Sequence, residues 1–309
     1  MINFSLMNNK QKFVNNKQTH TPVNNTKKLS FGQKLDNFVK MMEFEISTKC
    51  NYGKCSYCPV SLESSPVIQR IMPMKLFKKI LNDLKAIGYK GKISYQRYNE
   101  PLAVKAEDYV KKTKQALPDA QTEIFTNGIL LSEARLDSLR ESGVDKFIVT
   151  QHSKNGFITR LGDISDEKLK GVSVRYGDEL SLSNRGGTLI NIAPPRKQPC
   201  SRPSETMVID VDGNVFVCSD DYYKREKMGS VKTSSIKDIW LSTRYTNFRE
   251  NLKKGNREAS STCKSCSRVD SDNTLYNPDR LRNNEALFRK RLLEETGSAR
   301  LPVQEKKAS

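Results

Sequence analysis

The sequence predicts an α/β fold with a parallel sheet, followed by a smaller α+β module. Between residues 44 and 151, short apolar segments alternate with longer amphipathic segments, and this alternation is typical of βαβ units, whose strands lie parallel. After Pro194-Pro195 the pattern changes to a hairpin, a helix and a close pair of cysteines. With 309 residues, the chain is long enough for one large domain or two unequal ones.

The elements of the larger part follow one another closely. The first strand is expected at Phe44–Thr48, directly before three cysteines. An amphipathic helix is expected at residues 73–88, because six apolar residues share one face there. The further expected elements are a strand at residues 92–96, a helix at 106–117, a strand at 122–126, a helix at 133–142 that starts after Ser132, and a strand at 146–151. Functional sites in such sheets form at the carboxyl ends of the strands, where the three cysteines lie.

The smaller part is expected at residues 200–271, after a larger domain at residues 41–199. A β-hairpin is expected at residues 205–220, with Asp212-Gly213 as a two-residue turn between alternating apolar residues. Ser235 has an acidic residue three positions later, the pattern of a capping box, and the helix that it starts is expected to run to residue 255.

Both ends of the chain are predicted to be tails. Residues 1–40 are rich in Asn and Lys and carry a net charge of +6, so we expect them to be mostly disordered. Residues 272–309 contain one charged helical run followed by a polar end. A third of the net charge of +18 thus lies on a tail, and the rest forms no dense block. This distribution favours a basic, solvated surface over a nucleic-acid interface.

The segment composition also bears on location. No apolar run approaches the roughly 20 residues of a membrane span, and the first residues lack the apolar core of a secretory signal. We therefore expect a cytoplasmic protein. In a reducing compartment, clustered cysteines more often bind metal or take part in catalysis than form disulfides.

Three of the seven cysteines are crowded together in a C-x4-C-x2-C pattern, at Cys50, Cys55 and Cys58. Three thiolates on one short loop can hold three irons of a [4Fe–4S] cluster and leave the fourth iron open. A structural zinc site would recruit a fourth ligand nearby. The two histidines of the chain, His20 and His152, lie far away in sequence. The pattern therefore favours an iron–sulfur cluster.

With Tyr57 before the last cysteine, this segment resembles the radical S-adenosylmethionine (radical SAM) superfamily. The usual spacing there is C-x3-C-x2-C, and Gly53 lets the longer loop bulge. The resemblance implies a partial (β/α)6 TIM-like barrel and a cluster whose open iron binds S-adenosylmethionine. It also implies contacts of this cofactor, or of the substrate, with residues at the strand ends. By analogy the cofactor-binding residues are Tyr57, Asn99, Glu100, Asn127 and Gln151, and Tyr98 is substrate-binding.

The other four cysteines are Cys200, Cys218, Cys263 and Cys266. Taken alone, they would favour a zinc site. Behind a radical SAM domain they resemble the twitch module, a shortened SPASM domain. That resemblance implies an auxiliary [4Fe–4S] cluster with all four irons ligated, as suits electron transfer.

The segments "KFIVTQHS" and "LSNRGG", with the cysteine pattern, narrow the resemblance over residues 41–270 to the 2-deoxy-scyllo-inosamine dehydrogenases. These enzymes use a 5′-deoxyadenosyl radical to oxidise a carbinol to a ketone. The analogy implies that Arg185 is catalytic and orients the hydroxyl. Asp220 would bind substrate where those enzymes have Glu, and this shorter side chain implies a different polyol. His152 is interpreted as structural.

Two other interpretations remain open from the sequence. One is radical modification of a peptide or RNA, by epimerisation or cross-linking. The other is a non-catalytic zinc or cluster module that binds nucleic acid. On the leading interpretation the partners are a polyol or amino sugar and an external electron carrier such as flavodoxin or ferredoxin.

Overall fold

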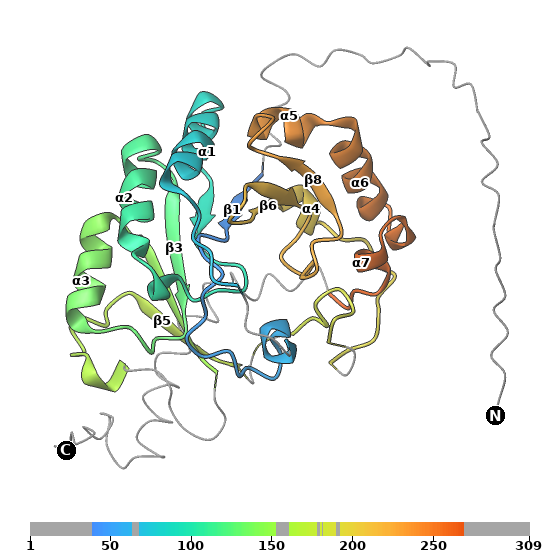
Figure 1. Cartoon of the computed structure of the whole chain (residues 1–309). Helices are drawn as coiled ribbons and strands as arrows, with labels where there is room; N and C mark the ends of the chain where they lie inside the picture. The colour runs from blue at the N-terminus through green and yellow to red at the C-terminus, as the bar shows by residue number, and fades with distance from the viewer. Residues whose placement is uncertain are drawn as a thin grey trace, which may run out of the picture. The chain divides into compact units, whose positions relative to one another are not determined.

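The computed structural model describes residues 39–63, 68–152, 161–177, 180, 182–189 and 192–268. The expected tails, apart from residues 39 and 40, lie outside these residues. The described chain forms one sheet in the order β5-β4-β3-β2-β1-β6-β7-β8 (Figure 1). The strands are β1 (Met41–Phe44), β2 (Lys92–Ser94), β3 (Gln121–Thr126), β4 (Lys146–Gln151), β5 (Val172–Tyr176), β6 (Thr206–Ile209), β7 (Asn214–Phe216) and β8 (Lys227–Ser230).

Six strands, from β5 to β6 across the sheet, pair in parallel, and β7 and β8 add an antiparallel edge. The expected α/β fold with a parallel sheet is thus confirmed, and the sheet of the described residues is not closed into a barrel. The expected boundary at residue 200 falls between β5 and β6, and these two strands belong to the same sheet. The hairpin of the smaller part therefore continues the larger one through the pairing of β6 with β1.

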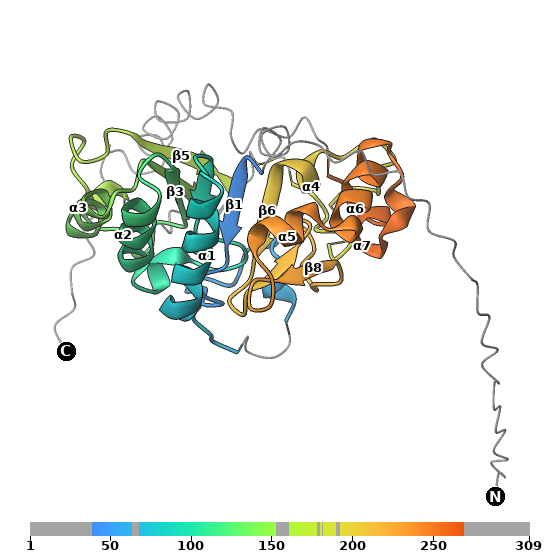
Figure 2. The same cartoon turned by 90° about the horizontal axis from the view of Figure 1, so that it is seen from above.

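Helices connect the parallel strands in the expected order. The α-helices are α1 (Met74–Ala86), α2 (Ala106–Ala116), α3 (Glu133–Ser142), α4 (Arg202–Glu205), α5 (Ile236–Leu241), α6 (Thr243–Lys253) and α7 (Ser261–Lys264). The short 3₁₀ helices are η1 (Pro59–Leu62), η2 (Pro101–Ala103), η3 (Leu161–Asp163) and η5 (Arg257–Ala259). Helices α1, α2 and α3 lie side by side on one face of the sheet (Figures 1 and 2). Before β5 and β6, the described residues form the short elements η3 and α4.

Local signals set several boundaries as expected. The Ser132 side chain accepts a hydrogen bond from the N–H of Arg135 at the start of α3, and Gly143 ends the helix with φ +103°. Strand β1, however, ends at Phe44 instead of starting there. The N–H of Glu45 still donates to the carbonyl of Ile209, and beyond it Ser47 forms an isolated bridge with Ile71.

Two corrections concern the second half. Four residues, Asp210–Gly213, connect β6 to β7 in place of the expected two-residue turn. The Asp210 carboxylate accepts from the N–H groups of Asp212 and Asn214, and Gly213 adopts φ +80°. The single helix expected up to residue 255 is divided into α5 and α6. Ser242 between them has an extended ψ of 145°, and its hydroxyl accepts from the N–H of Tyr245, so it caps a new helix.

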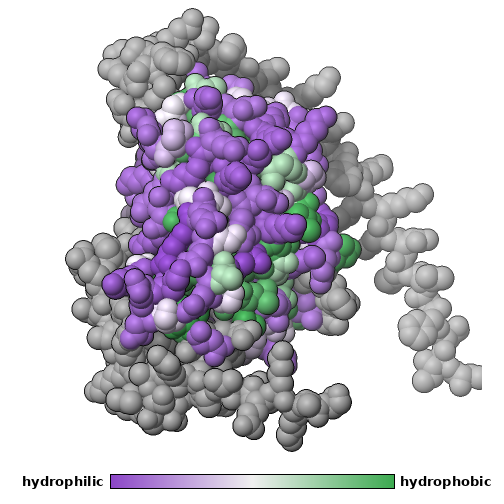
Figure 3. All heavy atoms as spheres, turned by 90° about the vertical axis from the view of Figure 1, so that its left-hand side faces the viewer, coloured by the Kyte–Doolittle hydropathy of each residue, from purple (hydrophilic) through white to green (hydrophobic). Residues whose placement is uncertain are grey.

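The two faces of the sheet differ in chemistry. Phe147 and Val149 on β4 belong to the main core under the helices. The alternating residues Ile148 and Thr150 point to the other face, where Ile148 packs with Met41 and Phe125 in a small cluster. The side of the molecule at the left of Figure 1 is mostly hydrophilic (Figure 3). Among the described residues, no helix is long and apolar enough to cross a membrane.

Candidate active site

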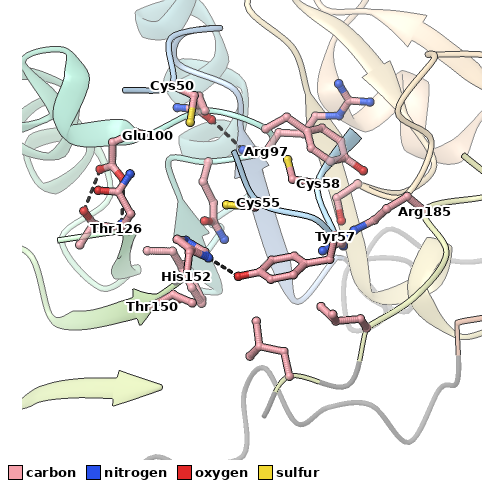
Figure 4. Close-up of a pocket in the computed structure, with 18 of the residues that line it drawn as sticks. Cys50, Cys55, Tyr57, Cys58, Arg97, Glu100, Thr126, Thr150, His152 and Arg185 are labelled. Atoms are coloured by element: carbon pink, nitrogen blue, oxygen red, sulfur yellow. Dashed lines mark hydrogen bonds between the residues drawn. The ribbon is translucent and has the colours of Figure 1, made fainter. Parts of the chain in front are cut away.

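A cavity lies where the strands end. Its walls come from the carboxyl-terminal parts of β1, β3, β4 and β5, from the segments that follow β1 to β5, and from the smaller part of the chain after residue 200 (Figure 4). The lining side chains include Glu43, Cys50, Tyr52, Cys55, Tyr57, Cys58, Arg97, Tyr98, Asn99, Glu100, Phe125, Asn127, Thr150, His152, Arg175, Arg185, Arg202 and Arg268. The structure therefore brings together the three crowded cysteines, Arg185 and most of the side chains expected around a cofactor.

The three crowded cysteines lie on a tight loop. Gly53 has φ +63°, the conformation expected for the bulge, and the N–H of Cys58 donates to the carbonyl of Cys55 at 3.0 Å. None of these cysteines is in a disulfide. Burial, and then the charges of Cys58 and Cys50, raise the pKa of Cys55 to about 12. Such crowded thiols become thiolates readily only beside cations, so the donor set fits an iron cluster.

The loop is tied to the neighbouring strand ends. The N–H of Glu100 donates to the carbonyl of Lys49 at 2.7 Å, just before Cys50. On the other side, the Asn127 amide donates to the side-chain oxygen of Asn51 at 2.8 Å. The expected cofactor residues Glu100 and Asn127 thus also hold the cysteine loop in place.

The Glu100 carboxylate is itself occupied. It accepts hydrogen bonds from the N–H of Leu102 at 2.9 Å, from the hydroxyl of Thr126 at 2.8 Å and from the N–H of Asn127 at 2.8 Å. Burial raises the pKa of Glu100, and these hydrogen bonds lower it in part. The carboxylate therefore fastens the end of β2 to the end of β3 (Figure 4).

Tyr57 is hydrogen-bonded through its hydroxyl to Nδ1 of His152 (Figure 4). Burial, and then the nearby charge of Arg175, lower the pKa of His152 to about 4, so the imidazole is neutral at physiological pH. Arg175 donates to the Thr150 hydroxyl at 2.7 Å, directly across the β4–β5 pair. Arg175 alternates with the core residues of β5 and lines the cavity. A charged residue within an alternating apolar strand could have indicated this role, but the sequence interpretation missed it.

The remaining expected cofactor and substrate residues are divided between cavity and core. The buried hydroxyl of Tyr98 has no hydrogen-bond partner among the described residues, and it lines the cavity. Asn99 also lines it, although its side-chain oxygen accepts from the N–H of Arg97 at 2.8 Å. Gln151 is buried at the end of β4 and does not line the cavity.

Arg185 reaches the cavity from a strained loop position. Its φ of +51° is unusual for a residue with a side chain, and both following glycines also have positive φ. One guanidinium nitrogen donates to Asp220 at 3.2 Å. Its buried Nε has no acceptor in the part of the chain that the structure describes. Arg185 thus has a donor available for a ligand.

Asp220, which was expected to bind substrate, is paired with arginines and is not among the residues that line the cavity. Its carboxylate accepts two hydrogen bonds from Arg268, one of them at 2.8 Å. Burial alone would raise the pKa of Asp220, but the charges of Arg268 and then Arg185 hold it far below its usual range. Arg268 also donates to the Ser183 hydroxyl at 3.3 Å, beside Arg185. No sequence motif pointed to Arg268, because only tertiary pairing reveals its role.

The other four cysteines lie in the smaller part of the chain, after residue 199. Burial, and then the charges of Cys218 and Cys266, raise the pKa of Cys263 to about 12. The fourth cysteine, Cys200, lies in a segment joined to the others by Arg257, which donates to the carbonyls of both Pro199 and Cys266.

Backbone donors already point at the sulfurs of this group. The N–H of Asp220 donates to Sγ of Cys218, and the N–H of Arg268 to Sγ of Cys266, both at 3.4 Å. Hydrogen bonds to sulfur are a known feature of cluster sites. Among the described residues, no three Cys, His, Asp or Glu side chains converge around a single metal ion. A [4Fe–4S] cluster binds each thiolate at a separate iron, so its cysteines need not converge on one point.

Comparisons with known proteins match both halves of the chain. The model of the radical SAM superfamily matches residues 44–161, and that of the SPASM iron–sulfur cluster-binding domain matches residues 200–267. The S-adenosyl-L-methionine-dependent 2-deoxy-scyllo-inosamine dehydrogenase of Niallia circulans is 37% identical over 243 residues, which cover 76% of this chain and 95% of that protein.

Solved structures agree with the sequence comparison. The crystal structure of BtrN in complex with AdoMet and 2-DOIA is 36% identical and has a TM-score of 0.69 over 75% of this chain and 94% of that one. Streptococcus suis SuiB bound to its precursor peptide has a TM-score of 0.51 at 14% identity over 70% of this chain and 68% of that one, which shows a shared fold alone. On these grounds the chain belongs to the radical SAM superfamily and carries a SPASM-type domain.

Proposed function

We propose that this protein is a radical SAM oxidoreductase that oxidises a secondary alcohol of a cyclitol or amino sugar to a ketone. The dehydrogenase at 37% identity supports this reaction class. The observation that carries the proposal is the link from one cavity to both cysteine groups. Arg185 shares the cavity with the crowded cysteines, and it donates to Asp220, whose own N–H donates to Cys218.

The two cysteine groups are proposed to hold different clusters. Cys50, Cys55 and Cys58 would bind three irons of a cluster that S-adenosylmethionine completes. Cys200, Cys218, Cys263 and Cys266 would bind all four irons of the auxiliary cluster. When bound, the first cluster and S-adenosylmethionine together would supply a hydrogen-abstracting radical, and the auxiliary cluster would supply an electron acceptor.

The side chains around the cavity would then bind and orient. Oxidation of an alcohol to a ketone removes one hydrogen atom, one proton and one electron from the substrate. Nε of Arg185, which has no partner among the described residues, would donate to the reacting hydroxyl. Arg is too basic to accept the proton of that hydroxyl, so its role would be to orient it. The hydroxyl of Tyr98, which is unpaired among the described residues, would offer a second contact to the polyol.

Further side chains are proposed to bind the cofactor. Tyr57, Asn99 and Asn127 line the cavity beside the cysteines. Glu100 would act through the backbone that its carboxylate fixes, and Gln151 through the position of the end of β4. Asp220 would hold Arg185 in place instead of touching substrate. An external electron carrier such as flavodoxin or ferredoxin would provide the electron for cofactor cleavage.

Anaerobic turnover tests this proposal. The reconstituted protein would be incubated with S-adenosylmethionine, a reductant and 2-deoxy-scyllo-inosamine or myo-inositol deuterated at its carbinol carbons. We expect a ketone lighter by one deuterium and one further hydrogen, with one 5′-deoxyadenosine per ketone. A matched variant with Ala at the three crowded cysteines should form neither product.

Other products would contradict the proposal. An alcohol of inverted stereochemistry, or a modified peptide in place of a ketone, would overturn the dehydrogenase assignment and leave the family membership standing. Deuterium that stays in the polyol while 5′-deoxyadenosine accumulates would also count against polyol oxidation.

A further inference from the structure

His152 contacts both spacers of the cysteine loop. Tyr52 lies in the four-residue spacer between Cys50 and Cys55, and Tyr57 lies in the two-residue spacer before Cys58. The ring of Tyr52 stacks on His152 with centroids 6.4 Å apart and planes inclined by 17°. Tyr57 is hydrogen-bonded to Nδ1 of the same ring. One imidazole at the end of β4 thus contacts each of the two chain segments that separate the cysteines.

The position of Tyr57 is restricted from a second side. An added Cβ at Gly177, directly after β5, would overlap with the hydroxyl of Tyr57. The side chain of Tyr57 therefore lies between His152 and Gly177, and the absence of a side chain at Gly177 leaves space for the Tyr57 hydroxyl. Gly177 is buried, and its φ is not in the left-handed region that demands glycine. Space for Tyr57 is thus a physical reason for glycine at this site.

The longer spacer needs such support. Asn51 is held by Asn127, and Lys49 by Glu100, but both contacts are at the start of the loop. From Gly53 onward, the loop has gained one residue relative to the spacing usual in the superfamily, and each added free residue increases the conformational entropy that cluster binding must overcome. His152 fixes the loop on either side of this point.

We propose that His152 is a positioning residue that holds the enlarged cysteine loop in the geometry that binds the first iron–sulfur cluster. It acts through Tyr52 and Tyr57 and does not itself bind iron. The inference rests on the proposed assignment of Cys50, Cys55 and Cys58 to that cluster.

Loss of iron to a chelator tests this role without any substrate. Iron leaves a cluster when its loop opens, so the rate follows the open population. Loss of the hydrogen bond in His152→Phe should speed release from the first cluster about fivefold. His152→Ala also removes the stacking on Tyr52, so it should speed release at least about tenfold. Release from the auxiliary cluster should keep its wild-type rate in both variants.

Two further variants make the test independent of the histidine. Tyr57→Phe removes only the hydroxyl and should match His152→Phe. Gly177→Ala should displace Tyr57 and also speed release from the first cluster. Tyr223→Phe, at an exposed tyrosine, is the matched control and should change neither rate. Electron paramagnetic resonance of the reduced proteins, with and without S-adenosylmethionine, would identify which cluster is lost.

The outcomes separate this role from the cluster assignment. A wild-type protein with about eight irons and unchanged release in His152→Ala and Tyr57→Phe would overturn the positioning role alone. Equal acceleration of release from both clusters would overturn it too, because that result indicates general unfolding. A wild-type protein with only about four irons, and with a resonance spectrum that S-adenosylmethionine does not change, would overturn the assignment of the first cluster itself.

Discussion

Replacement of Arg268 by methionine removes the principal partner of a buried carboxylate. Asp220 is 2% exposed and accepts two hydrogen bonds from Arg268 but only one from Arg185. Removal of one member of a buried ion pair destabilises a protein by about 3–5 kcal/mol. Because Arg185 remains, we expect the lower end, about 3 kcal/mol, which lowers the melting temperature of a chain of this size by about 6 °C.

Thermal unfolding of the anaerobically reconstituted protein, compared at equal iron content, measures this loss. Lys253→Met is the matched control, because its pair with Glu250 is half exposed and should contribute less than about 1 kcal/mol. Arg268→Met combined with Asp220→Leu should recover part of the loss, since no unpaired charge stays buried. A melting temperature of Arg268→Met within about 2 °C of the wild type would refute the reasoning.

Three further outcomes are expected. Alanine at the three cysteines of the Cys50–Cys58 loop should lower the iron content from about eight to about four per chain and abolish formation of 5′-deoxyadenosine, as measured by iron assay and chromatography. Glu100→Gln should destabilise the protein by about 1–3 kcal/mol in thermal unfolding, because an amide N–H₂ group then faces donors such as the N–H of Asn127. His152 has a folded pKa of about 4, below its usual 6.5, so its contribution to stability is complete above pH 6.5 and is lost as the pH falls through 4. The melting temperature should therefore fall more between pH 7.5 and 5 in the wild type than in His152→Gln.

Local chemistry made much of the fold predictable. Ser132 and Gly143 carry the cap signals of α3, and the structure ends the helix where they indicate. The start of β1 was harder to predict, because Met41 and Met42 are not β-branched and so do not identify a strand. The break at Ser242 was missed for a related reason. A serine in a helical pattern is also compatible with a continuous helix, and only the hydrogen bond to Tyr245 distinguishes the two.

The site divides in a similar way. The cysteine motifs fix which thiols share a loop, so the sequence alone brings Cys50 and Cys58 close together. The orientation of Asp220 depends on Arg268, which lies 48 residues further along the chain. No spacing rule connects these two residues. The contact of His152 with Tyr57, over 95 residues, is likewise set by the order of the strands.

The pairing of β1 with β6 has a consequence for the biosynthesis of this protein. Strand β1 emerges from the ribosome early, and β2 can cover one of its edges, but the other edge waits for Thr206–Ile209. At about 5–20 residues per second, this wait lasts roughly 10 to 30 seconds. During that time β1 presents unpaired N–H and C=O groups that can pair with strands of other nascent chains. A shortened gene that ends before residue 200 would make this exposure permanent, so expression of the first half alone should give insoluble protein.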